Sequence, residues 1–122
     1  MAAFNWIEFQ AACPACSREC VVRAQCHVAS SYDGDDAGRF HDRSYGLTQA
    51  MRWWPSSDPR WAGWREGGQA IDEAGDGAVE CCYANCGRCG ADLFAIIRFA
   101  SRVPCEVTRL GLEEDWPADF SR

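Results

Sequence analysis

The chain has 122 residues, of which 48% are hydrophobic and 25% are charged, and it carries a formal net charge of −6. This composition is typical of a globular protein with one modest core, so we expect a single domain over residues 1–122. It excludes a membrane span, which requires roughly 18 consecutive apolar residues. The first residues lack a basic segment followed by a long apolar run, so we expect no secretory signal and a cytoplasmic location.

Alternating apolar residues predict a hairpin in the first part of the chain. Residues 4–9 alternate, and so do residues 20–28, where the even-numbered positions from Val22 to Val28 fall on one face. The pair Cys13-Pro-Ala-Cys16 lies between these two segments, so it would occupy the tip of the hairpin. A further strand over residues 39–45 is expected to pair with the second strand.

A tryptophan-rich insert is expected over about residues 39–77. Residues 46–55 fit either a short helical turn or an extended arm that Pro55 ends. The tryptophans at positions 61 and 64 would share one face of a helical turn. Residues 65–77 are rich in glycine and acidic residues and are predicted to form a loop.

The second part of the chain repeats the pattern of strand, cysteine pair and strand. Strands are predicted over residues 78–84 and 91–100, on either side of Cys86-Gly-Arg-Cys89, with a return strand over 105–110 and a surface tail over about 111–122. The expected fold is therefore mostly β, with a small α+β fold as the alternative. It is an antiparallel sheet built on two cysteine-tipped hairpins, with the insert packed against one face.

The two C-x-x-C pairs predict a metal site. Each pair can wrap a tight turn around one ion, and together they supply the four thiolates that tetrahedral Zn²⁺ prefers, from Cys13, Cys16, Cys86 and Cys89. The total of nine cysteines is odd, and a reducing compartment favours metal over disulfides. Because protein fills all four positions, the zinc would be structural; iron is compatible with the same ligands but is less expected.

The arrangement of these pairs between strands resembles the zinc-ribbon and rubredoxin-like class of metal sites. The resemblance depends on the four cysteines, on Pro14 and on Gly90, and it covers only the two turns and the strands beside them. Turns of that class commonly read C-P-x-C-G. This chain departs from the pattern at Ser17, where glycine is usual, and at Gly87, where proline is usual. The resemblance implies a structural zinc or, with iron, an electron carrier.

The remaining cysteines and the histidines carry weaker signals. Five cysteines lie outside the two pairs, namely Cys20, Cys26, Cys81, Cys82 and Cys105. Cys26 is expected to pack as a small buried thiol, and the adjacent Cys81 and Cys82 should face opposite sides of a strand, with one of them inside. A second metal site, formed by Cys20, Cys26, His27 and either Cys81 or Cys82, is the alternative. His27 and His41 are expected at the surface, and because no catalytic motif is present we predict that the protein is not an enzyme.

Tryptophans and acidic runs are the candidates for a binding surface. Trp53, Trp54, Trp61 and Trp64 either roof the sheet as a secondary core or form a contact surface, because tryptophan is enriched at interaction hot spots. The acidic residues Asp33, Asp35, Asp36, Asp72, Glu73 and Asp76 either lie in solvated loops or face a basic partner.

The expected function is that of a cytoplasmic protein-binding module, of the acidic inhibitor or immunity type, which binds another protein and no membrane. One alternative is a nucleic-acid- or polymerase-associated zinc ribbon. It requires Arg23, Arg52, Arg60 and Arg65 to converge on one face, and the net acidity argues against it. A rubredoxin-like electron carrier is the third possibility.

Overall fold

The computed structural model describes residues 2–34, 40–72 and 75–122, and it confirms the mostly β prediction. The strands are β1 (Asn5–Ala12), β2 (Glu19–Cys26), β3 (Ser44–Gly46), β4 (Ala70–Ile71), β5 (Gly77–Cys86), β6 (Asp92–Ala100) and β7 (Val103–Leu112). They form one sheet in the order β3-β1-β2-β5-β6-β7, and β4 pairs with β5 beyond the end of β2. Short 3-10 helices, η1 (Trp61–Arg65) and η2 (Glu113–Asp115), complete the described elements.

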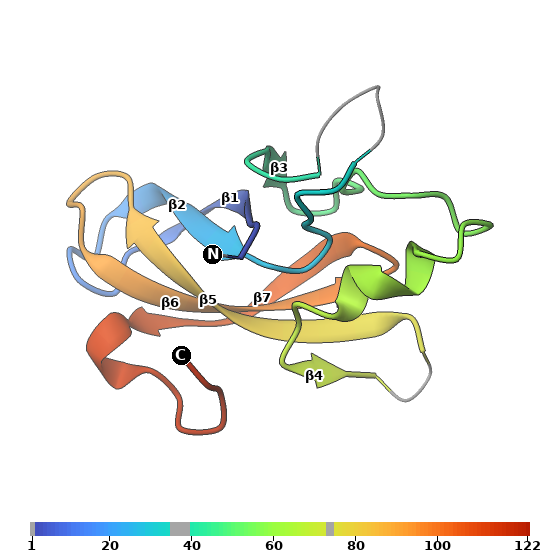
Figure 1. The fold of residues 1–122 in the computed structure, drawn as a ribbon. Helices are drawn as coiled ribbons and strands as arrows, with labels where there is room; N and C mark the ends of the chain where they lie inside the picture. Colours follow the sequence, from blue (N-terminus) through green and yellow to red (C-terminus); the bar gives the residue numbers. More distant parts are fainter. Residues whose placement is uncertain (1, 35–39, 73–74) are drawn as a thin grey trace.

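Both expected hairpins are present, and they lie side by side. β1 pairs with β2, β5 pairs with β6, and β2 pairs with β5, all antiparallel. β3 departs from the prediction, because it spans only Ser44–Gly46 and runs parallel to β1 instead of pairing with β2. The reason is that β1 and β5 occupy both edges of β2, which leaves the outer edge of β1 open. The sheet is therefore mixed and curled (Figure 1).

The main core lies on one face of the sheet and follows the predicted alternation. The side chains from Val22 to Val28 at even-numbered positions are fully buried. β6 is buried on both faces, because its second face is covered by the C-terminal tail. Trp116 and Phe120 of that tail pack against a smaller cluster of Cys81, Phe94 and Ile96. The tail thus lies along the surface as expected.

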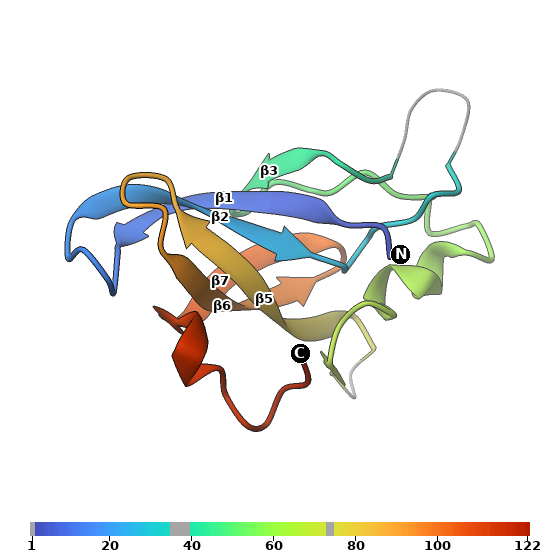
Figure 2. The same cartoon turned by 60° about the vertical axis from the view of Figure 1, so that its left-hand side comes forward.

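The tryptophan-rich insert lies at the end of the sheet opposite to the two cysteine turns, as Figure 1 and Figure 2 both show. Its first part is the extended arm: the N–H groups of Thr48 and Met51 donate to the carbonyls of Pro104 and Arg102. The expected helical turn at positions 61 and 64 is η1. The predicted loop over 65–77 contains the short strand β4. In the described part of the chain, neither 3-10 helix has the length or apolar character needed to cross a membrane.

Candidate metal centre and tryptophan cleft

Four cysteine sulfur atoms converge where the two hairpins end. The Sγ atoms of Cys13, Cys16, Cys86 and Cys89 all lie within 4.8 Å of one another. The Sγ atoms of Cys13 and Cys89 are 3.8 Å apart. Four sulfurs placed about 2.3 Å from a tetrahedral Zn²⁺ would be separated by about 3.8 Å. The two pairs therefore form a cluster that is compatible with one tetrahedral metal ion.

Pairing between the hairpins brings the cysteine turns together. Val22 of β2 lies opposite Cys86 of β5, and just beyond that pair the N–H of Gly87 donates to the carbonyl of Val21 over 2.8 Å. A Cβ atom at Gly87 would lie only 2.8 Å from the same carbonyl oxygen. Proline at this position would lack the N–H donor and would meet the β2 backbone, which explains the departure from the usual C-P-x-C sequence.

Each turn places two backbone donors on the sulfur of its first cysteine. The N–H groups of Ala15 and Cys16 point to the Cys13 sulfur at 3.3 and 3.4 Å. Those of Arg88 and Cys89 point to the Cys86 sulfur, both at 3.3 Å. The Cys89 N–H is the main cause that lowers the pKa of Cys86 to about 6. These donors favour the thiolate, which is the form that binds metal.

The residue after each pair closes its turn in a left-handed conformation. The N–H of Ser17 donates to the carbonyl of Cys13 at 2.8 Å, and that of Gly90 donates to the carbonyl of Cys86 at 2.9 Å. Their φ angles are 63° and 75°. Glycine adopts this conformation without strain and serine does not, so the first turn keeps the geometry of the second at a higher conformational cost.

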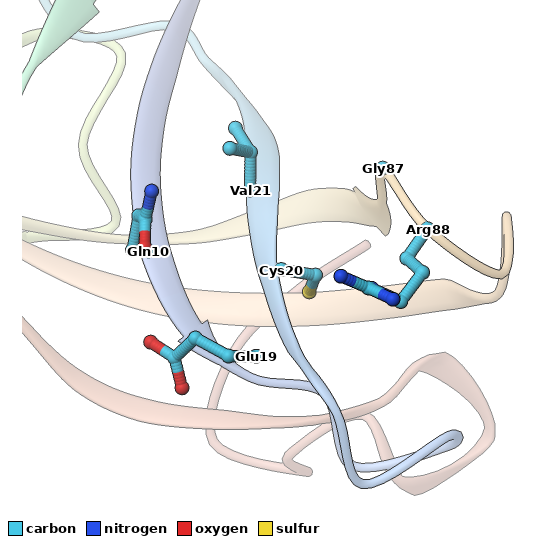
Figure 3. Close-up of a pocket in the computed structure, with 6 residues that line it drawn as sticks. All are labelled: Gln10, Glu19, Cys20, Val21, Gly87 and Arg88. Carbon is cyan, nitrogen blue, oxygen red and sulfur yellow. The ribbon is translucent and has the colours of Figure 1, made fainter.

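A fifth thiol, that of Cys20, lies beside the cluster. Its burial, aided by its contact with Cys86, raises the pKa of Cys20 to about 12, so it remains a neutral S–H group. Cys20 and Arg88 point toward one another across a surface hollow of about 660 Å³, which Gln10 and Glu19 also line (Figure 3). Cys20 therefore lies next to the cluster without belonging to it, and the four metal ligands are the cysteines of the two C-x-x-C pairs.

The possible second metal site is not assembled. Cys26 and Cys82 lie in the main core, where their thiols donate to the carbonyls of Val28 and Glu80. Cys81 belongs to the smaller cluster on the other face, as expected for adjacent residues of a strand. Across residues 2–34, 40–72 and 75–122, the four-cysteine cluster is the one group of three or more histidine, cysteine or acidic side chains that could hold a metal.

At the other end of the sheet, a hollow of about 560 Å³ opens next to the insert. We call it the tryptophan cleft. It is lined by aromatic, charged and small residues from three segments of the chain, namely Ala2, Ala3, His27, Ser30, Ser31, Asp33, Trp53, Trp54, Pro59, Arg60, Ala62, Gly63, Glu66 and Gly67. The ring of Trp54 makes edge-to-face contacts with Trp53 and with the buried Phe40, at centroid distances of 4.7 and 4.6 Å. This packing gives the cleft a rigid aromatic wall.

The residues predicted to bind a partner do not all lie on one surface of the structure. Trp53, Trp54 and Asp33 line the cleft. Trp61 is half-buried, and its carbonyl accepts the indole N–H of Trp53 at 2.9 Å. Asp72 and Asp76 line a separate hollow around β4. Three further predicted acids, Asp35, Asp36 and Glu73, lie outside the described residues.

Trp64 requires a correction. It is only 1% exposed and belongs to the main core, so it does not contribute to a contact surface. Its carbonyl accepts the N–H of Ala29 at 2.8 Å, which joins η1 to the segment that follows β2. Trp64 therefore packs against the sheet as part of the core, which is the alternative role that the sequence allowed for the tryptophans.

Glu80 is a buried carboxylate that our sequence interpretation overlooked. It is 3% exposed and accepts the backbone N–H groups of His27 and Val28, at 2.8 and 3.2 Å. It also contacts His27 Nδ1 at 2.7 Å, and this hydrogen bond raises the pKa of His27. The pairing of β2 with β5 ends at Gln25, and the Glu80 carboxylate accepts the backbone N–H groups of the residues that follow β2. The sequence did contain a signal for this burial. Glu80 lies two residues from both Ala78 and Cys82 in the same strand, so its side chain points to the same face as these apolar residues.

Comparison of the chain with models of known protein families, with curated proteins and with solved structures finds no match. The functional conclusion therefore depends on the metal centre and the tryptophan cleft themselves.

Proposed function

We propose that the chain is a non-enzymatic, cytoplasmic protein-binding module of the zinc-ribbon-like class, in which a structural zinc stabilises the fold. The observation that carries this proposal is the spatial separation of two features. A closed four-sulfur cluster lies at one end of the sheet, and an acid-rimmed aromatic cleft opens at the other. A metal ion in the cluster would stabilise the fold, and the cleft would bind a partner.

The donor set supports zinc in a structural role. Four thiolates complete a tetrahedral shell and leave no position for water or substrate. Neither two-stranded hairpin could bury enough apolar surface to be stable alone, whereas an ion shared between their tips joins them. Iron in the same ligands would instead give an electron carrier. Zinc is the simpler assignment because it prefers this tetrahedral geometry and needs no redox partner.

The cleft and the net charge support a protein partner with a basic surface. A net charge of −6 gives the molecule a negative field, which accelerates association with a positively charged protein. Exposed carboxylates such as Asp33 lie at the cleft, where the half-buried Trp53 and the 7% exposed Trp54 form a rigid apolar wall. This combination fits an acidic inhibitor or immunity-type protein.

Two of the arginines that a nucleic-acid surface would use are already engaged. Arg23 lies 3.4 Å from Glu8 and over the ring of Trp6, and Arg60 is paired with Asp58 at 2.8 Å. Pairing of this kind reduces the positive potential available to phosphates. The protein partner is therefore the better-supported alternative.

The metal is tested by elemental analysis of freshly purified, reduced protein. We expect one zinc ion per chain in a colourless preparation. A red preparation with stoichiometric iron would contradict the structural role and indicate electron transfer instead. A preparation without any transition metal would contradict the proposal.

The binding role is tested through association kinetics. A partner isolated by affinity capture would be titrated with the wild-type protein and with a variant in which Asp33, Asp72 and Asp76 are changed to asparagine. We expect association at low ionic strength to be slower in the variant by about tenfold, with a smaller difference at high salt. Equal association rates at both salt concentrations would contradict the proposal.

A further inference from the structure

Arg60 already occupies the aromatic wall of the tryptophan cleft. Its guanidinium carbon lies 4.5 Å from the centroid of the Trp54 ring. The Nε and Nη2 groups donate to the two carboxylate oxygens of Asp58 at 2.9 and 2.8 Å. The cleft is therefore built to accept a planar cation, with an indole against its face and a carboxylate along its edge.

The cleft contains more negative charge than Arg60 neutralises. Asp33 contributes to the electrostatic stabilisation of the Arg60 cation, although Asp58 is the dominant partner. Glu66 also lines the cleft, on the same side as Gly63. In the ranges that the structure describes, the carboxylates of Asp33 and Glu66 form no hydrogen bond or ion pair with another residue. Asp58 is therefore paired with Arg60, Asp33 adds to the stabilisation of its charge, and Glu66 lines the same cleft.

We infer that the tryptophan cleft binds the guanidinium group of an arginine side chain of the partner, stacked on Trp54 in the place that Arg60 holds in the free protein. Asp33, Asp58 and Glu66 supply the counter-charges. The inference rests on the proposed function, since it names the group of the partner that the cleft recognises.

Arginine fits this site better than lysine. A guanidinium is planar, so it can stack on an indole while its N–H groups reach carboxylates along the edge, and it is more weakly hydrated than an ammonium group. Arg60 is itself held in this way, and its side chain is 61% exposed, so it can swing into solvent without disturbing the core. Arg60 thus acts as an internal competitor for the cleft.

The first test uses a blocked amino acid as the probe. ¹⁵N-labelled protein with its metal bound would be titrated with N-acetyl-arginine methylamide while the indole N–H signals are followed by NMR. We expect the signals of Trp53 and Trp54 to shift, with a Kd on the order of 1 mM. The matched control is N-acetyl-citrulline methylamide, which has nearly the same shape but is uncharged, and it should shift these signals little.

The second test uses variants that leave the core intact. Arg60→Ala removes the internal competitor and should tighten binding of the arginine probe by about threefold. The double change Asp33→Asn with Glu66→Gln removes two exposed counter-charges and should weaken binding by about fivefold. The control pair, Glu114→Gln with Asp115→Asn in η2 of the C-terminal tail, loses the same charge at the cysteine end of the sheet and should leave the Kd unchanged.

Several outcomes would overturn the inference. These are equal binding of the arginine and citrulline probes, weaker binding after Arg60→Ala, or equal losses from the cleft and tail double changes. If the probe fails to bind but partner association still depends on the acidic residues, only the inference is lost. If the probe binds and partner association ignores those residues, the proposed function is wrong and the site remains a guanidinium site.

Discussion

The two ends of the sheet are stabilised by different kinds of interaction. At the cysteine end, two turns place four sulfurs within 4.8 Å, and every backbone donor to those sulfurs comes from the same turn. At the tryptophan end, the insert is held by contacts with distant segments, such as the 2.8 Å hydrogen bond that the N–H of Ala29, just after β2, donates to the carbonyl of Trp64. In the zinc-bound protein that we propose, the first end depends on one ion, and the second depends on packing between distant segments.

This difference predicts that the two ends can be weakened separately. Loss of the ion should release both hairpin tips and unfold the chain, because the core spans both hairpins. A defect in the insert should loosen the cleft and leave the metal centre in place. The predictions below test this contrast, beginning with the largest expected effect.

The substitution Cys13→Ser should abolish stoichiometric metal binding and destabilise the fold by several kcal/mol. Structural zinc contributes folding free energy on the order of 10 kcal/mol in small domains, and a neutral hydroxyl is a poor replacement for a thiolate. Metal content and urea-induced unfolding would be measured together. The control is Cys105→Ser on β7, whose thiol donates to the Val103 carbonyl away from the cluster. Comparable stability of both variants and wild type would show that the ion does not support the fold.

The substitution Gly67→Ala should destabilise the protein by about 3 kcal/mol, because it overpacks a site that is already closed. A Cβ atom at this position would lie 2.2 Å from the carbonyl oxygen of His27, so the insert would have to move away from the segment after β2. The amide of Ala29, which donates to Trp64, should exchange with solvent faster, and the metal content should remain that of wild type.

A matched control for this change exists at Gly46. A Cβ atom there meets nothing within 4 Å, so Gly46→Ala should leave stability within about 0.5 kcal/mol of wild type. If Gly67→Ala also released the metal, the two ends would be coupled and the contrast between them would be lost.

The contrast also explains how much of the molecule could be predicted from its sequence. The hairpins and the two cysteine turns depend on alternation and short spacing, which are local signals. Cys13 and Cys89 are 76 positions apart, and their convergence was predicted because two C-x-x-C pairs together supply one set of four metal ligands. The burial of Trp64 and the bonds of Glu80 depend on which distant segments meet. The position of β3 depended on which strand edge remained open after the hairpins had paired. No pattern within a short window contains that information.

A smaller effect is expected where the two cysteine turns differ. Gly90→Ser would give the second turn the residue of the first, at a φ of 75°, and should cost about 1 kcal/mol. Ser17→Gly removes the same strain at a φ of 63°, but it adds conformational entropy to the unfolded chain, so the net change should be smaller. Chemical unfolding of both metal-bound variants measures the difference. If both substitutions lowered the free energy of unfolding by the same amount, the interpretation that Ser17 and Gly90 close equivalent turns would be wrong.

The smallest effect concerns pH at the tryptophan end. The hydrogen bond to Glu80 raises the pKa of His27 above its ordinary value of 6.5, so the folded protein holds this proton more tightly than the unfolded chain. The resulting stabilisation is complete below pH 6.5 and is lost as pH rises through the pKa of the folded state. We therefore expect wild type to lose stability relative to His27→Gln as the pH rises above 6.5.

The difference between wild type and His27→Gln isolates this contribution, because the titration of the cysteine cluster is common to both proteins and cancels. The glutamine amide can still donate to the Glu80 carboxylate, so the variant removes the proton equilibrium while the contact is retained. Unfolding free energies measured at several pH values give the slope. A difference that does not change with pH would show that His27 holds its proton equally in both states, and the carboxylate would then act only through the backbone N–H groups of residues 27 and 28.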